Sequence, residues 1–389
     1  MTSCLFVAAL MISGPLDFRR HEIDAFPSGY QVAVADVNGD GRPDVIALST
    51  TADRIDWYEN PGWQRRPVAR TAKNIDLAAH VSTGDGRLEL AVATGFYFED
   101  ATRGGEILLL RQAADPNRVW TQQRIAVDPV VHRLRWGDLD GSGHKQLVHA
   151  PLFGPGSRGA KEPKPAHLWA FQIPGDLQLA HIQVTKIDES LTVLHGLCVA
   201  DLDGDGRDEI LTASFEGIHR FDLEGQGPNA RWKKTQISVG APPVSTEPGA
   251  ARGSSEIVPG RFADGRPFLA AIEPWHGHQA VVYTPRDQDG LWQRRVLDDT
   301  LREGHALVVA DWDQDGVDEI VAGWRGGDGG LRLYDPLDDR GSGFRTIAID
   351  QGLAVEGAVA ADMNGDGRLD LVVIAGRTNN LVWYENRPR

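Results

Sequence analysis

One acidic loop recurs along the chain and constrains the fold more than any other feature of the sequence. It stands at residues 36–44, 201–209, 311–319 and 362–370. Each copy carries oxygen-bearing side chains at positions 1, 3, 5 and 9, and a glycine at position 6 permits a sharp turn. Such a density of hard oxygen donors is typical of calcium sites. The expected calcium ligands are Asp36, Asn38, Asp40, Asp44, Asp201, Asp203, Asp205, Glu209, Asp311, Asp313, Asp315, Glu319, Asp362, Asn364, Asp366 and Asp370.

The flanks of the loops predict strands. Short apolar runs such as Val32–Ala35 and Val45–Leu48 stand on either side, where an EF-hand would need helices. Each loop should therefore join two strands. The clustered carboxylates would repel one another without a cation, so we expect the calcium to be structural.

The spacing of the loops predicts a repeat architecture. Two gaps are about double the others, and the partial motifs at 81–86 and 260–265 fill them, while a copy at 138–146 has lost two ligands. The seven copies then follow a period of about 54 residues, which suits one four-stranded propeller blade. The sequence thus predicts an all-β, seven-bladed β-propeller.

The chain ends predict how the ring closes. A first outer strand at 16–23 precedes the first loop, whereas the last copy stops after Trp383–Asn386 without an outer strand. The N-terminal strand should complete the C-terminal blade and so hide two sheet edges. We expect an N-terminal apolar segment at 1–14, either an extra strand or signal-like, followed by a single propeller over 15–389.

Composition narrows the function classes. The formal charge of −15 disfavours nucleic acid as a partner, and no apolar run is long enough for a membrane span. Two cysteines provide no disulfide framework. The compartment and the oligomeric state stay open, although full carboxylate sets favour a periplasmic or secreted setting over a cytoplasmic one.

A second repeat position lies six residues before position 1 of each loop, where the innermost strand should begin. This position holds Tyr30, Ile75, His132, His195, Ser254, His305 and Glu356. Innermost strands line the channel of a propeller, so equivalent positions should converge on the axis. A single histidine there could simply bond a neighbouring blade. Three histidines in one register favour a zinc or similar divalent site, with His132, His195 and His305 as ligands and Glu356 as a fourth ligand or a base.

The inner strand should run from the histidines to the acidic loop, so these features lie on opposite faces. Loops between second and third strands return to the histidine face and carry aromatic, basic and imidazole groups suited to an oxygen-rich ligand such as a sugar. His276 and His278 are candidates for general acid or base. The candidate substrate-binding residues are Tyr30, Tyr97, Arg133, Lys161, Trp275 and Arg325.

The acidic loops with flanking strands resemble the FG-GAP/VCBS repeat family of calcium-loop propellers over nearly the whole chain. With the axial histidines, the pattern is similar to the propeller of aldos-2-ulose dehydratase-like proteins. That resemblance implies a metal-dependent carbon–oxygen lyase, a dehydratase acting by β-elimination on a keto-sugar or related carbohydrate.

The alternative is a non-catalytic carbohydrate-binding or adhesion propeller stabilised by calcium. Lectin propellers usually repeat their site between blades, whereas the loops on this histidine face differ, which favours one axial site.

Overall fold

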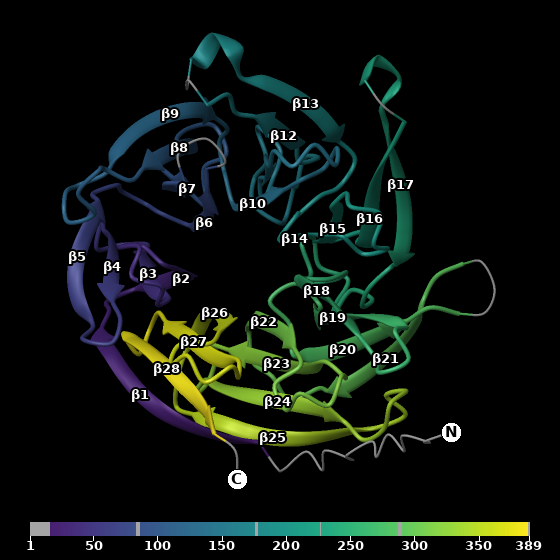
Figure 1. Cartoon of the computed structure of the whole chain (residues 1–389). Coiled ribbons are helices and arrows are strands. Elements are labelled where there is room, and N and C mark those ends of the chain that lie inside the picture. Colours follow the sequence, from purple (N-terminus) through teal and green to yellow (C-terminus); the bar gives the residue numbers. More distant parts are fainter. Residues whose placement is uncertain (1–15, 83–85, 176–177, 226, 287–289, 388–389) are drawn as a thin grey trace, which may run out of the picture.

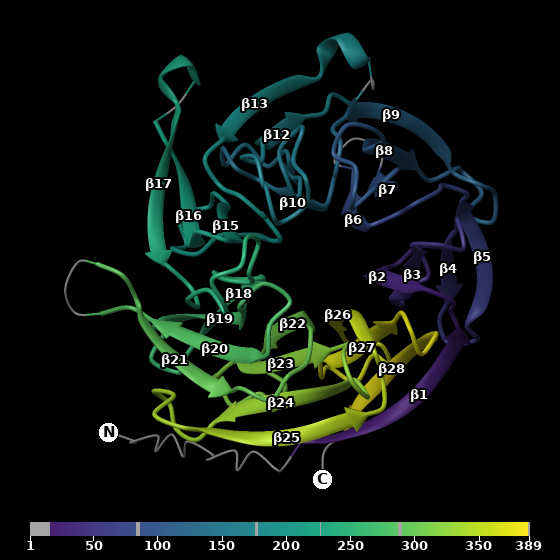
Figure 2. The same ribbon diagram turned by 180° about the vertical axis from the view of Figure 1, so that it is seen from behind.

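Seven four-stranded antiparallel sheets surround a common axis in the computed structural model (Figure 1; Figure 2 gives the view from behind). The structure describes residues 16–82, 86–175, 178–225, 227–286 and 290–387. The predicted seven-bladed β-propeller is confirmed. The predicted segment 1–14 and part of the partial loop at 81–86 lie outside the described residues. We number the blades 1 to 7 by their innermost strands in chain order.

The innermost strands contain the position at which the histidines recur or begin one or two residues after it. They are β2 (Gly29–Ala35), β6 (Asp76–Val81), β10 (Arg133–Gly137), β14 (Gly196–Ala200), β18 (Glu256–Arg261), β22 (Gly304–Ala310) and β26 (Val355–Ala361). The second strands, which follow the acidic loops, are β3 (Asp44–Ser49), β7 (Leu88–Thr94), β11 (Gln146–Ala150), β15 (Glu209–Ser214), β19 (Pro267–Glu273), β23 (Glu319–Trp324) and β27 (Asp370–Ala375).

Third and outer strands complete each blade. The third strands are β4 (Ile55–Glu59), β8 (Glu106–Arg111), β12 (Leu168–Gln172), β16 (Gly217–Glu224), β20 (Gln279–Thr284), β24 (Gly330–Pro336) and β28 (Asn380–Arg387). The outer strands are β5 (Gln64–Ala69), β9 (Thr121–Val127), β13 (Gln183–Asp188), β17 (Arg231–Ser238), β21 (Gln293–Asp298), β25 (Phe344–Gln351) and β1 (Asp17–Ala25). Two 3₁₀ helices, η1 (Leu179–His181) and η2 (Gly227–Asn229), lie in loops. In the described ranges, no helix has the length and hydropathy that a membrane crossing requires.

The ring closes as the sequence predicts. Strand β1 pairs antiparallel with β28, from Asp17 opposite Arg387 to Ala25 opposite Asn380. The imidazole of His21 stacks on Trp383 with ring centroids 4.4 Å apart. Figure 1 shows the N-terminal strand in purple beside the yellow C-terminal strands. The last blade is therefore assembled from both ends of the chain.

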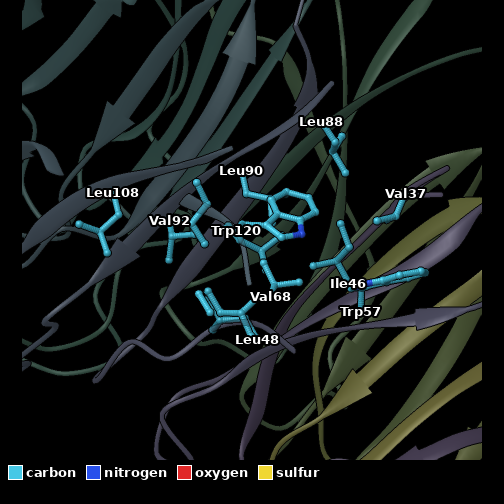
Figure 3. Close-up of a cluster of buried hydrophobic side chains, with 14 residues drawn as sticks. Val37, Ile46, Leu48, Trp57, Val68, Leu88, Leu90, Val92, Leu108 and Trp120 are labelled. Atoms are coloured by element: carbon cyan, nitrogen blue, oxygen red, sulfur yellow. The ribbon is translucent and has the colours of Figure 1, made fainter. Parts of the chain in front are cut away.

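The core lies between neighbouring blades. Second strands such as β3 and β27 are buried along their whole length because another blade covers each face, which explains their continuous apolar runs. Between blades 1 and 2, Trp57 and Trp120 pack with aliphatic side chains (Figure 3). Outer strands alternate between half-buried and exposed residues. The rigid ring that results can hold side chains from distant blades in fixed positions at the axis.

Candidate active site at the propeller axis

Three histidines from consecutive blades meet at the axis. His195 directly precedes β14, His276 lies in the turn between β19 and β20, and His305 is the second residue of β22. One ring nitrogen of each lies within 4.8 Å of a ring nitrogen of the other two. We call these three residues the axial cluster. Closed packing of the blades thus brings together imidazoles that are far apart in the sequence.

Hydrogen bonds at the back of its ring fix the tautomer of His195. Its Nδ1 atom donates to the carbonyl oxygen of Ser255 at 3.0 Å and lies 3.1 Å from Oε1 of Glu256. With the proton on Nδ1, the Nε2 atom keeps a lone pair. Such outer partners commonly orient histidine ligands of metal ions.

His305 is held in the same way. Its Nδ1 atom donates to the carbonyl oxygen of Glu356 at 2.6 Å, and its Nε2 atom accepts a hydrogen bond from the hydroxyl of Tyr30 at 3.0 Å. Burial raises the pKa of Tyr30 to about 12, so the phenol keeps its proton and remains a donor. Both His195 and His305 therefore offer the lone pair of Nε2.

His276 has the opposite tautomer. Its Nδ1 atom accepts a hydrogen bond from Nη2 of Arg325 at 3.3 Å, so Nε2 carries the proton and donates to Nε2 of His195 at 2.9 Å. The backbone holds it at a φ of 47°, and its ring stacks on Trp275 with centroids 4.8 Å apart. His276 can thus ligate through Nε2 only after it exchanges tautomer, and it can accept a proton only at Nδ1, in place of the hydrogen bond from Arg325.

His132 stands beside the axial cluster. Its ring centroid lies 4.7 Å from that of His195, yet it is not part of the set whose nitrogens lie within 4.8 Å. Its Nδ1 atom is buried and has no hydrogen-bond partner among the residues that the structure describes. A buried nitrogen in this state is available to a ligand atom that enters the site.

The four imidazoles are kept neutral. Burial lowers the pKa of His132, His276 and His305 well below the usual value, and it lowers the pKa of His195 against the opposing effect of Glu256. A neutral imidazole can bind a metal ion or accept a proton. The environment therefore suits both uses.

Two buried arginine–glutamate pairs support the cluster and differ in their electrostatics. Nη2 of Arg133 lies 2.6 Å from Oε1 of Glu256, and Nη1 of Arg325 lies 2.7 Å from Oε2 of Glu356. Burial raises the pKa of Glu256, but Arg133 and His195 outweigh it and bring the pKa below the usual value. Burial raises the pKa of Glu356 above the usual value despite Arg325. Glu256 is thus an ionised orienting group, and Glu356 is the carboxyl that more readily holds a proton.

A cavity of about 510 Å³ lies on the histidine face between blades 1, 2 and 7; its lining includes Tyr30 and Glu356, which contact His305, but no residue of the axial cluster. Tyr30 and Glu356 form its inner wall, and Tyr97 forms part of its outer wall. The guanidinium carbon of Arg103 lies 4.2 Å from the centroid of the Tyr97 ring. The volume is in the range of small-molecule sites.

The acidic loops lie at the opposite ends of the innermost strands. In two of them the carboxylates converge within 4.8 Å, namely Asp311, Asp313, Asp315 and Glu319 in blade 6 and Asp201, Asp203 and Glu209 in blade 4. These clusters could hold a cation. Burial first, and then neighbouring carboxylates such as Asp313, raise the pKa of Glu319 to about 9, and a bound cation would favour the ionised form against both.

In the loops whose position 9 is aspartate, this residue accepts backbone hydrogen bonds on both of its carboxylate oxygens. Both carboxylate oxygens of Asp370 accept backbone N–H bonds, from Met363 at 2.9 Å and from Asn386 at 2.8 Å. The side-chain amide of Asn386 in turn donates to the carbonyl oxygen of Trp312 in blade 6 at 2.8 Å. Asp44 and Asn60 repeat the arrangement in blade 1. The repeated Trp-Tyr-Glu-Asn motif therefore ties each of these loops to the preceding blade.

Comparisons with known proteins agree with this architecture. A family model for the β-propeller domain of aldos-2-ulose dehydratase matches residues 104–286, and models for an FG-GAP-like repeat and an FG-GAP repeat match 311–373 and 28–53. Aldos-2-ulose dehydratase from Phanerodontia chrysosporium is 25% identical over 323 residues, 77% of this chain and 34% of the relative. The predicted resemblance is confirmed. The chain spans about a third of the length of that dehydratase.

A solved structure shares the fold alone. A candidate 6-phosphogluconolactonase from Bacteroides uniformis ATCC 8492 superposes with a TM-score of 0.52 at 13% identity, covering 92% of this chain and 91% of that one. Similarity in sequence to the dehydratase propeller therefore says more about this site than similarity in fold does.

The dehydratase-like propeller gathers most of the residues predicted for the site. His276 joins the cluster, whereas His278, two residues on, is exposed. Tyr30 and Tyr97 line the cavity, but Lys161 is exposed on the blade 3 insert and is not among the lining residues. The further predicted residues Arg133, Arg325 and Trp275 support the histidines from behind.

Sequence reasoning missed Glu256. This residue lies two positions after Ser254, outside the repeat position at which the histidines recur, and blade 5 has no complete acidic loop to set the alignment. The sequence contains one signal that could have identified Glu256. It is a lone carboxylate at the start of an innermost strand, where a buried charge needs a partner of opposite charge. Arg133 is that partner.

Proposed function

We propose that the chain is a metal-dependent carbon–oxygen lyase that removes water from a keto-sugar or related carbohydrate at the propeller axis. The observation that carries the proposal is the cluster of neutral imidazoles next to a cavity of sugar size. Similarity to the propeller of aldos-2-ulose dehydratase supports a carbohydrate-related role.

The donor set fits a transition-metal ion. His195 and His305 present Nε2 lone pairs while their Nδ1 protons are bonded to backbone carbonyls. A third nitrogen would come from His132, because the proposal uses His276 and Glu356 for proton transfer. Imidazole ligands suit zinc and similar divalent ions. A bound ion of this kind would polarise the substrate carbonyl and stabilise negative charge that develops on it.

The chain's own residues account for the proton transfers. β-Elimination removes a proton from the carbon next to the carbonyl, breaks a carbon–oxygen bond at the following carbon and releases water, leaving a conjugated enone. His276 is the base through Nδ1, which accepts the proton once the substrate replaces the 3.3 Å hydrogen bond from Arg325. Glu356, on the cavity wall, delivers a proton to the leaving oxygen because its raised pKa lets it hold one.

Substrate contacts come from the cavity wall. Tyr97 offers a flat aromatic surface to the sugar, and Tyr30 offers a hydroxyl next to His305. Arg133 and Arg325 are committed to Glu256 and Glu356, so they act as positioning residues. The sequence predicts His278 and Lys161 for the acid/base and substrate-binding roles, but both are exposed and neither lines the cavity, so the proposal gives these roles to other residues.

We further propose that the acidic loops bind calcium as a structural ion. The proposal rests on convergent carboxylates in blades 4 and 6 and on the same ligand pattern in blades 1 and 7. A single propeller over residues 15–389 remains the proposed domain organisation, and a periplasmic or secreted setting the proposed location.

The test is an assay of the full chain, loaded with zinc and calcium, on a panel of keto-sugars monitored for ultraviolet-absorbing enones. The wild type should form an enone from at least one of them. His276→Ala should lower kcat by about 100-fold or more, within the usual contribution of a general base, while the matched His278→Ala in the same turn should not. No enone from any keto-sugar, or equal rates for the two variants, would overturn the proposal.

A further inference from the structure

A second cavity, of about 920 Å³, lies between blades 2 and 3 on the face that carries the acidic loops. Its walls come from the ends of β6, β8, β10 and β12 and from the starts of β7 and β13. His80 and Trp136 stand one position before the ends of their innermost strands, at the end opposite to the axial cluster. We call this cavity the blade 2/3 groove. It is separate from the proposed lyase site.

The blade 2/3 groove lies beside the blade 3 loop, which keeps Asp138 and Asp140 but lacks two of the carboxylates of the intact loops. In blade 3, position 5 is Ser142, and positions 7 to 9 are His144, Lys145 and Gln146. Intact loops have carboxylates at positions 5 and 9. The oxygen of Gln146 still accepts the backbone N–H of Leu139 at 2.8 Å, which keeps the turn of the loop without the charge. Neutral side chains, Ser142 and Gln146, therefore replace two carboxylates, and Lys145 adds a positive charge at position 8.

An aromatic surface lies in the groove. The rings of His80 and Trp136 pack against each other with centroids 4.9 Å apart and planes tilted by 36°. The indole N–H of Trp136 donates to the carbonyl oxygen of Ala78 at 3.2 Å, which fixes the ring, and the side chain is half-buried. A fixed, partly exposed indole is the kind of surface on which the apolar face of a sugar ring can pack.

The groove is also positively charged relative to the rest of the molecule. Its charged lining residues are Arg111 and Lys145, opposed by Glu89 alone. Nε of Arg111 bonds to Glu89 at 2.6 Å and its Nη1 donates to the carbonyl oxygen of Gly175 at 3.0 Å, so the guanidinium is held in place with donors remaining. In a chain of formal charge −15, a local excess of positive charge selects an anionic ligand.

We propose that the blade 2/3 groove binds an anionic saccharide, with the sugar ring on Trp136 and its carboxylate or phosphate between Lys145 and Arg111. The amides of Gln172 and Gln183 line the same cavity and supply hydrogen bonds to hydroxyl groups. The chemistry that the groove recognises is an oxygen-rich ring carrying negative charge, whether from a uronic acid or from a sugar phosphate.

Calorimetric titration of the full calcium-loaded chain tests the proposal. The ligands are glucuronate, glucose 6-phosphate, neutral glucose and inorganic phosphate. At least one of the two anionic sugars should bind, with glucose and inorganic phosphate each about tenfold weaker or more, because glucose lacks the charge that Lys145 and Arg111 contact and inorganic phosphate lacks the ring that packs on Trp136. Inorganic phosphate that binds as tightly as the sugar phosphate would overturn the saccharide assignment, and no binding of either anionic sugar would overturn the site.

Variants test whether the binding measured by calorimetry takes place in the blade 2/3 groove. Lys145→Glu, a change at an exposed side chain, and Trp136→Ala should each weaken binding by about tenfold or more. Lys233→Glu, at an exposed lysine of β17 outside the groove, is the matched control and should bind as the wild type does. His195→Ala should also bind normally. Unchanged affinity in Lys145→Glu would contradict the proposal, and lost affinity in His195→Ala would assign the ligand to the axis instead.

Discussion

The Nε2 atoms of His195 and His276 lie 2.9 Å apart, although the two residues belong to different blades and are held by different partners. Ser255 and Glu256 hold the back of one ring, and Arg325 holds the back of the other. One nitrogen is therefore an acceptor and the other a donor. This asymmetry is the physical reason to assign His195 to a metal ion and His276 to proton transfer.

Glu256 should control metal affinity without touching the ion. Glu256→Gln removes the negative charge beside Nδ1 of His195, which makes the imidazole a weaker ligand. Loss of such an outer partner costs about 10- to 100-fold in affinity. Competition with a chromophoric zinc chelator measures it. Glu162→Gln, on the exposed blade 3 insert, is the control, and equal zinc affinity in both variants would refute this role of Glu256.

Calcium should stabilise the ring, and its removal should make stability depend on pH. Burial first, and then Asp313, raises the pKa of Glu319 to about 9. In the calcium-free chain the unfolded state releases this proton first, from about pH 4.5, so the free energy of unfolding falls as pH rises through about 9. Thermal melting with and without chelator should show a lower Tm without calcium, and the difference between the two Tm values should widen as pH rises. An unchanged Tm on chelation would rule out the calcium assignment.

Asp128 should destabilise the folded state at neutral and alkaline pH. It is 4% exposed, and burial raises its pKa to about 7. His149, 3.7 Å away, cannot compensate as an ion pair because burial lowers its pKa to about 3. The unfolded chain releases the Asp128 proton from about pH 4, so the stability of the wild type falls between about pH 4 and 7.

Asp128→Asn removes this penalty. At pH 8 the variant should be more stable than the wild type by on the order of 2–4 kcal/mol, and at pH 4 the difference should be small. Urea unfolding at both pH values measures it. Asp115→Asn, at an exposed carboxylate, is the control. A gain that is equal at pH 4 and pH 8 would show that the effect is not one of ionisation.

The buried amide of Asn386 should stabilise the junction between blades 6 and 7. Asn386→Ala removes donors to the carbonyl oxygens of Trp312 and Leu369, at 2.8 and 3.2 Å, and leaves that of Trp312 with only the 3.3 Å bond from Arg368. We expect a loss of about 1–3 kcal/mol in the free energy of unfolding. Asn117→Ala, at an exposed turn, should cost far less, and similar losses in the two variants would contradict the role given to Asn386.

The fold could be predicted from the sequence because the same pattern recurs in successive copies along the chain. The acidic loops gave the period, and the unpaired strand at each end of the chain gave the closure of β1 on β28. The repeat position that holds the histidines predicted part of the site for the same reason, because equivalent positions on the blades of a propeller lie near one another at the axis. It found His195 and His305, both of which lie at the start of an innermost strand.

The rest of the site does not follow the repeat. His276 enters the cluster from a turn, at a φ of 47°, while His278 in the same turn is exposed, and periodicity cannot separate the two. Glu256 is visible only once Arg133 of another blade is seen to face it. Tautomers and buried ion pairs depend on contacts between blades, which a single sequence does not contain.

The most direct test of the account is the metal content of the purified chain after equilibration with zinc and calcium and removal of loosely bound ions. The wild type should retain one zinc per chain together with calcium, and His195→Ala should retain the calcium but lose the zinc. Calcium alone in the wild type, or zinc retained by His195→Ala, would contradict an axial metal site built on this histidine.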